Sequence, residues 1–189
     1  MNEVERIHQD LVAIEKIVVA SNDVSAIAAY GEHSAKTLLL AGASYFERRV
    51  TAAVQTYLDA STASVAIKHF AYHQAVDRKF FSFFDFSAEA KNINSFINKF
   101  GADFSAWAKA DMPNVAIDKD AQLAFLNFCR LRNSLVHNNY ATFAINKTLA
   151  EVKTGFDAAS KVADWIETSF QRFEAEQLAA PAAPADVAD

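Results

Sequence analysis

Residues 32–60 read EHSAKTLLLAGASYFERRVTAAVQTYLDA, and this stretch decides the fold class. It contains one glycine, Gly42, and no proline, so it lacks the residues that most often interrupt a helix. Apolar residues recur every three or four positions, as they do on one face of a helix: Leu38, Leu39, Ala43, Phe46, Val50 and Val54. The stretch therefore predicts a helix with one broad buried face, about 43 Å long at about 1.5 Å per residue.

The composition of the whole chain points the same way. Only 4 of the 189 residues are glycine and 3 are proline, whereas the tight turns of a β-rich fold need many of both. A net charge of -5 argues against a generally basic surface for nucleic acid, so such a contact would need local basic clusters. The single cysteine, Cys129, excludes an internal disulfide and a multi-cysteine zinc site.

Periodicity and capping residues predict the remaining helices. We expect helices over 3–20, a short piece ending at Gly31, 63–78, 87–100 with Ser87 as N-cap, 102–110, 119–137 with Asp118 as N-cap, and a last helix from the Thr148-x-x-Glu151 pattern to about Leu178. Pro113 marks a loop, and Asn138 and Asn139 end the helix before them. The prediction is an all-α, up-and-down bundle of about five to six helices, forming one domain over residues 1–178.

The two ends of the chain carry weaker signals. Residues 179–189 are rich in Ala and Pro, which predicts a disordered tail. The N-terminus is mixed in charge, and no apolar stretch approaches the ~20 residues that span a bilayer, so we expect no signal peptide, no membrane contact and a cytoplasmic protein.

Two features of the middle of the chain leave alternatives open. Aromatic residues crowd positions 80–107, which favours a core between helices but also fits a groove for a partner helix or a nucleotide, with Phe83 and Phe84 in it. His69 and His73 lie four positions apart, so they share a helix face and suit either a metal or a half-buried pair. No Gly-rich phosphate loop accompanies them, and we expect no metal and no cofactor.

The stretch that carries chemistry is FCRLRNSLVHNNY, residues 128–140. Helical spacing places Arg130, Asn133, Ser134 and His137 on one stripe, with Arg132 beside it. These residue types suit phosphodiester cleavage in RNA, because His exchanges protons near neutral pH and the Arg fork matches phosphate oxygens. The reaction needs both a base and an acid, so a two-fold dimer would supply the second histidine. A charged helix end with a C-terminal His is also what the helix dipole favours.

Residues 132–137, RNSLVH, fit the R-x4-H form of the R-x4–6-H motif, and the chain here resembles HEPN domains. Arg130 satisfies the longer spacing but lacks the polar residue that follows Arg132. The segment from Leu38 to Val50 is similar to the early long helix of the RiboL-PSP and MAE-like branches, and Glu47 loosely matches an acidic position there. One branch has a Tyr two residues after the His, where this chain has Asn139 and places Tyr140 one residue later.

The resemblance implies a metal-independent endoribonuclease with a composite site at a homodimer interface, acting as a toxin with a cognate antitoxin or in phage defence. Arg132 and His137 would be catalytic with Asn133 in support, and Arg130, Ser134, Asn138 and Tyr140 would bind the RNA substrate. The alternative is a non-catalytic HEPN-type scaffold that binds a protein or nucleotide partner.

Overall fold

The computed structural model describes residues 1–179, and within that range it contains helices and loops but no strand. The α-helices are α1 (Glu3–Ala20), α2 (Val24–Ser61), α3 (Val65–Ala71), α4 (Phe80–Phe83), α5 (Asn94–Ile97), α6 (Ala102–Asn114), α7 (Lys119–His137) and α8 (Leu149–Ala179). A π-helical turn, Tyr72–Val76, follows α3, and a 3-10 turn, Asn98–Phe100, follows α5. The all-α prediction is confirmed.

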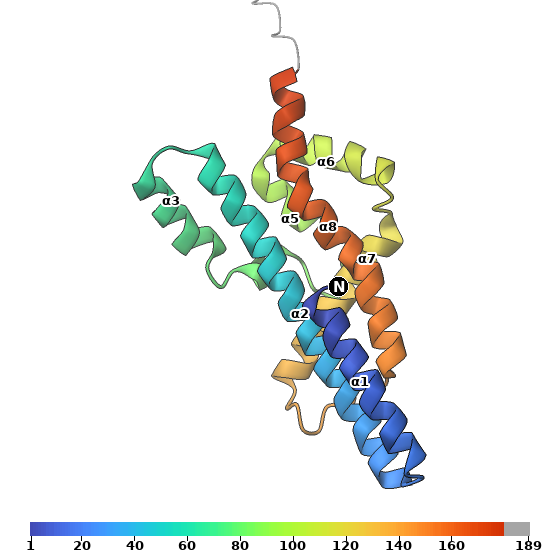
Figure 1. Ribbon diagram of the computed structural model, residues 1–189. Helices are drawn as coiled ribbons and strands as arrows, with labels where there is room; N and C mark the ends of the chain where they lie inside the picture. Colours follow the sequence, from blue (N-terminus) through green and yellow to red (C-terminus); the bar gives the residue numbers. More distant parts are fainter. Residues whose placement is uncertain (180–189) are drawn as a thin grey trace, which may run out of the picture.

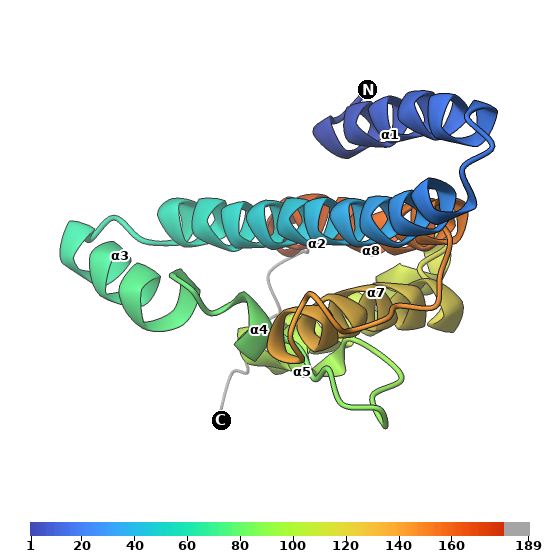
Figure 2. The ribbon, with the colours of Figure 1, turned by 90° about the horizontal axis from the view of Figure 1, so that it is seen from below.

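Four long helices build the scaffold (Figure 1). α2 and α8 lie side by side and run in the same direction, because Phe46 stacks on Phe156 and, further along both helices, Tyr57 stacks on Phe170. α1 folds back along α2, where the hydroxyl of Tyr30 donates to the carbonyl of Leu11. α7 passes on the other side of α2 and packs on both α2 and α8 (Figure 2).

The core is centred where α2, α7 and α8 meet. The ring centre of Phe46 lies 5.6 Å from that of Phe125, 5.5 Å from that of Phe128 and 5.0 Å from that of Phe156. Close packing requires a glycine nearby on α2. A Cβ at Gly42 would lie 2.8 Å from Cζ of Phe128 and 2.9 Å from Cδ2 of Phe156, so any side chain there would force the rings apart.

Helices with clear capping residues are where the sequence predicted them. In α7 the side chain of Asp118 accepts a hydrogen bond from the amide of Ala121 at 2.8 Å. At the start of α8, Thr148 Oγ1 accepts from the amide of Glu151 at 3.2 Å, and the Glu151 carboxylate accepts from the amide of Thr148 at 2.8 Å. These reciprocal bonds satisfy two amides that the first turn of a helix leaves free.

The predicted break at Gly31 is wrong. α2 is continuous from Val24 to Ser61, and Gly31 lies within it at an ordinary helical position with no other atom near its missing Cβ. The N-cap is Asp23, whose carboxylate accepts from the amides of Ser25 and Ala26. A glycine costs a helix only about 1 kcal/mol, which tertiary packing along 38 residues overrides.

The segment around the aromatic residues differs most from its prediction. Ser87 does not cap a helix over 87–100; only 94–100 is helical. Asp85 accepts from the amide of Ser87 at 2.9 Å and Asn92 accepts from the amide of Asn94 at 3.0 Å, so polar side chains take backbone donors that a helix would have used. Pro113 lies in the last turn of α6 rather than in a loop.

The helix predicted over 63–78 is also divided. It becomes α3 and the π-helical turn, and α3 stands away from the bundle in both views with no buried residue (Figures 1 and 2). With the unpredicted α4, the described residues form eight α-helices rather than five to six. Ala179, predicted as the first residue of the tail, ends α8, and residues 180–189 lie outside the described part of the chain.

The aromatic residues of this segment are core. Phe83 and Phe84 are each 5% exposed, so they do not line an open groove. Within residues 1–179 no helix combines the length and the apolarity that crossing a bilayer needs.

Candidate functional site

The end of α7 is defined by local hydrogen bonds. The backbone amide and the side-chain amide of Asn138 both donate to the carbonyl of Ser134, at 3.0 and 2.9 Å. Asn139 then adopts a φ of 57°, a left-handed conformation that Asn tolerates. As the sequence predicted, α7 ends at His137 and Asn138 and Asn139 reverse the chain. Leu135 is fully buried beneath this turn, whereas the His137 side chain is exposed.

Arg132 lies in a half-closed environment between α7, α2 and α4. Its guanidinium carbon lies 4.7 Å from the centre of the Phe81 ring, a cation–π arrangement. Nη2 lies 4.0 Å from Oε2 of Glu47, which is an ion pair but too long for a hydrogen bond. Nη1 donates to Oδ1 of Asn133 at 3.4 Å, and Nε is buried with no acceptor among the described residues. The guanidinium is therefore shielded but makes no short hydrogen bond.

Other shielded arginines are paired differently. The side chain of Arg49 is 16% exposed, close to the 20% of Arg132, yet it donates to Glu167 on two nitrogens and to Asp164 at 2.7 Å. These carboxylates raise the pKa of Arg49, with Glu167 as the largest cause. Arg172 donates to both oxygens of Asp111, at 2.9 and 2.5 Å. Arg132 stands apart from both because its donors are not used by a carboxylate.

Arg130 does not join Arg132. Its Nη1 donates to the carbonyl of Ser87 at 3.0 Å and its Nη2 donates to Oδ1 of Asn127. The side chain thus holds the loop before α5, and its predicted part in binding RNA would require it to leave these partners.

The structure groups only some of the predicted site residues. Arg132 contacts Asn133, while Ser134 and Asn138 contact each other at the helix end. Five positions separate Arg132 from His137, which turns their side chains about 140° apart around the helix and about 7.5 Å apart along it. Among the described residues, no hydrogen bond or ion pair joins the two side chains.

The structure adds two residues that the sequence reasoning did not select, Phe81 and Lys36. Lys36 is completely buried, and its Nζ lies 2.5 Å from Oε1 of Glu32 and 3.0 Å from the carbonyl oxygen of Tyr140. The same Nζ lies 5.1 Å from the centre of the Tyr140 ring. A signal for Lys36 was present, because it lies three positions before Leu39 and seven before Ala43, on the buried stripe of α2.

Cys129, His69 and His73 were the other side chains that could have formed a reactive or metal-binding site. Burial raises the pKa of the Cys129 thiol, and the charge of Arg132 offsets this only in part, so Cys129 is a core residue. The rings of His69 and His73 lie 4.4 Å apart on the exposed arm formed by α3 and the π-helical turn that follows it. In residues 1–179 there is no group of three or more His, Cys, Asp or Glu side chains that could hold a metal ion.

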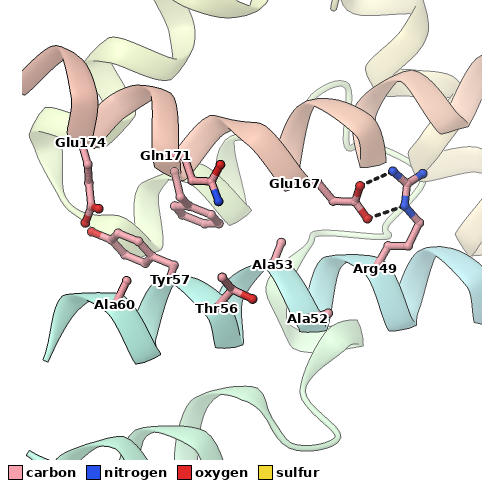
Figure 3. A pocket seen from close by; sticks show the side chains of 10 residues that line it. Arg49, Ala52, Ala53, Thr56, Tyr57, Ala60, Glu167, Gln171 and Glu174 are labelled. Carbon is pink, nitrogen blue, oxygen red and sulfur yellow. Dashed lines mark hydrogen bonds and ion pairs between the residues drawn. The ribbon is translucent and has the colours of Figure 1, made fainter. Parts of the chain in front are cut away.

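A groove of 290 Å³ lies between the second halves of α2 and α8 (Figure 3). Small side chains, among them Ala52, Ala53 and Thr56, line its α2 side, and Arg49 closes one end through its bonds to Glu167. None of the predicted site residues lines this groove. Its single cation is already neutralised, so we place the candidate site at the end of α7.

No protein-family model, curated protein or solved structure matches the chain.

Proposed function

We propose that the chain is a metal-independent endoribonuclease of the HEPN type that works as a homodimer, with His137 as proton-transfer group and Arg132 as phosphate-binding group. The observation that carries the proposal is the pairing of Arg132. A guanidinium that is 20% exposed, supported by an aromatic ring and free of short carboxylate bonds retains donors for a phosphate. In arginines that stabilise the fold, such as Arg49, these donors already bond to carboxylates.

The chemistry requires no bound cofactor. A ribose 2′-hydroxyl attacks the adjacent phosphorus and passes its proton to one histidine. The P–O5′ bond breaks, and the leaving oxygen takes a proton from a second histidine. The products are a 2′,3′-cyclic phosphate and a free 5′-hydroxyl. Arg132 offsets the negative charge that grows on the phosphate oxygens, and His137 from each of two protomers supplies one base and one acid.

Three neighbours adjust Arg132 for this task. The Phe81 ring holds the guanidinium from one side without consuming a donor. Glu47, 4.0 Å away, keeps a charge of opposite sign near the arginine until a phosphate replaces it. Asn133 orients the same guanidinium through its side-chain oxygen. Arg130, Ser134, Asn138 and Tyr140 remain in the proposal as residues that would contact the RNA. Arg130 would first have to leave the Ser87 carbonyl and Asn127.

The test is cleavage of RNA in excess EDTA, with product ends identified. We expect wild type to cleave and His137→Ala to lose about 10²–10⁴-fold in rate. Arg132→Ala should lose about 10²–10³-fold, as when one electrostatic donor is removed. Both variants should unfold at the wild-type temperature, because His137 is exposed and Arg132 makes no short bond.

Matched controls separate the site from general charge effects. His69→Ala removes a histidine from the exposed arm and Arg48→Ala removes an arginine paired with the exposed Glu3. Both should cleave as wild type does. Cleavage by His137→Ala at the wild-type rate, or products with 3′-hydroxyl ends, would contradict the proposal.

The alternative is a non-catalytic scaffold, again of the HEPN type. Its original support, an open aromatic groove, is gone because Phe83 and Phe84 are buried. What favours it now is α3, where Val65, Ile67 and Phe70 are 79%, 57% and 67% exposed. If folded, dimeric wild-type protein does not cleave RNA, the result would favour this scaffold function over the nuclease. A toxin or phage-defence role in the cytoplasm follows from the nuclease proposal, and relief of growth inhibition by His137→Ala would test it.

A further inference from the structure

Lys36 is a buried ammonium on the otherwise apolar stripe of α2. It belongs to the stripe of α2 that includes Leu39 and Ala43, and its side chain is 0% exposed. Burying a charge is costly unless the charge is paired and hydrogen-bonded. The carboxylate of Glu32 supplies the pairing, and that interaction lowers the pKa of Glu32. The second partner is not a side chain but the backbone carbonyl of Tyr140.

The bond to Tyr140 fixes the chain just after α7. Residues 138–142 otherwise bond only among themselves or to α7: Asn138 to Ser134, and Thr142 and Phe143 to the carbonyl of Asn139 at 3.1 and 3.0 Å. Within residues 1–179, the Lys36 bond is the hydrogen bond that ties residues 138–142 to another helix. The segment then returns to the start of α8, where Ile145 and Leu149 are buried (Figure 2).

His137 has no side-chain hydrogen bond or ion pair of its own among the described residues, so its position depends on the backbone around it. On its N-terminal side Leu135 anchors the helix in the core. On its C-terminal side the nearest anchor from outside α7 is the bond from Lys36 to Tyr140, three residues on.

We propose that Lys36 is the positioning residue of His137: its buried ammonium clamps the carbonyl of Tyr140 and thereby holds the last turn of α7 in place. The proposal rests on the nuclease function above. Proton transfer requires the catalytic group within about 0.5 Å of its productive position, and a displacement of about 1 Å costs roughly 10²-fold in rate. A side chain that touches neither RNA nor His137 therefore sets the rate through the backbone.

The test is Lys36→Met, whose side chain is one atom shorter than lysine and carries neither charge nor donors. Removing one partner of a buried ion pair is destabilising when it leaves a buried charge. Here the remaining carboxylate of Glu32 is half exposed and can be solvated. We expect kcat for RNA cleavage to fall about 10–10²-fold with KM nearly unchanged. Amide hydrogen exchange of Asn138, Thr142 and Phe143 should accelerate, and the His137 ring should become more mobile by NMR relaxation.

Glu32→Gln is the matched comparison, because it leaves the bond from Lys36 to the Tyr140 carbonyl in place. It also takes the charge partner from a buried ammonium, so it should lower the free energy of unfolding. At a temperature where the variant stays folded, it should keep kcat and slow exchange at 138–143. If Lys36→Met does not fold, the double variant Glu32→Gln/Lys36→Met, which has no uncompensated carboxylate, takes its place.

The outcomes separate this proposal from the nuclease assignment. Faster exchange at 138–143 with reduced kcat supports the clamp. Wild-type exchange and wild-type kcat in Lys36→Met overturn it, as does a rise in KM alone, which would place Lys36 in substrate binding. If wild type does not cleave RNA, the nuclease assignment fails and the catalytic role of Lys36 fails with it. The exchange and NMR data then still decide whether the clamp itself exists.

Discussion

Two shielded arginines, Arg49 of α2 and Arg132 of α7, lie on different sides of α2 and are paired differently. On the α2–α8 side, Arg49 donates to Glu167 and Asp164. On the α2–α7 side, Arg132 is shielded to almost the same degree but has only a distant Glu47. The two guanidinium groups thus differ in pairing rather than in burial. Arg49 uses its donors within the fold, and Arg132 retains the donors that a phosphate would take under the proposed function.

Packing at the crossing of α2 with α7 and α8 holds the helices that carry Arg49 and Arg132 in place. Phe46→Ala should break it, because Phe46 contacts Phe125 and Phe128 of α7 and Phe156 of α8. We expect a loss of about 3–5 kcal/mol in the free energy of unfolding, as for other buried Phe→Ala changes. Urea denaturation measures it.

Val136→Ala is the control for this loss, because Val136 is 47% exposed at the end of α7. It should change the free energy of unfolding by less than about 0.5 kcal/mol. A similar loss in both variants would mean that the crossing is not the centre of stability.

Gly42→Ala tests the closeness of the crossing without removing a ring. The new Cβ would meet Phe128 at 2.8 Å, and overpacking of this kind costs about 1–3 kcal/mol. Gly31→Ala is a control on the same helix, since nothing lies within 4 Å of its Cβ position. There we expect a gain of about 0.4–1 kcal/mol, because alanine restricts the unfolded chain. Thermal unfolding of the pair distinguishes packing from helix propensity; a gain in both variants would contradict the close approach.

Replacing each of the two arginines with glutamine measures how much its pairing contributes to stability. Arg49→Gln should cost about 1–2 kcal/mol, since it breaks bonds to two carboxylates that are partly solvated. Arg132→Gln should cost less than about 0.5 kcal/mol, because its one ion pair is long. Chemical denaturation gives both values. Equal losses would show that Arg132 is held for stability after all.

The hydrogen bonds at the start of α8 make a small contribution to stability that depends on pH. Thr148→Ala removes the N-cap hydroxyl and should cost about 1 kcal/mol in unfolding free energy at pH 7. The amide of Thr148 lowers the pKa of Glu151, and its hydroxyl adds to this. That contribution is complete above the unfolded pKa of Glu, about 4.3, and disappears as the pH falls through the lower folded value. Thermal unfolding as a function of pH should therefore show a smaller effect of Thr148→Ala at pH 3 than at pH 7.

Glu151→Gln is the control for the pH dependence. It cannot titrate, so its stability difference from wild type should also shrink in acid. A Thr148→Ala effect that is the same at pH 7 and pH 3 would assign the whole contribution to the bond that Thr148 Oγ1 accepts from the amide of Glu151.

Local sequence signals were sufficient to predict α7 and the start of α8. Asp118 begins α7, Asn138 and Asn139 end it, and Thr148 with Glu151 begins α8. These features act over three or four residues, so they operate before the chain has a tertiary structure. The position of His137 at the end of α7 followed from the same local pattern.

Other features depend on tertiary packing and could not be predicted from local signals. The tertiary structure carried α2 through Gly31, because packing along the whole of α2 outweighs one glycine. It divided the aromatic segment into short turns around a shared core. It also gave Arg130 and Arg132 different partners and placed Lys36 beneath Tyr140, 104 residues away. Contacts between residues far apart in the sequence depend on how complete helices pack, and helix periodicity records which residues are buried but not which partner they meet.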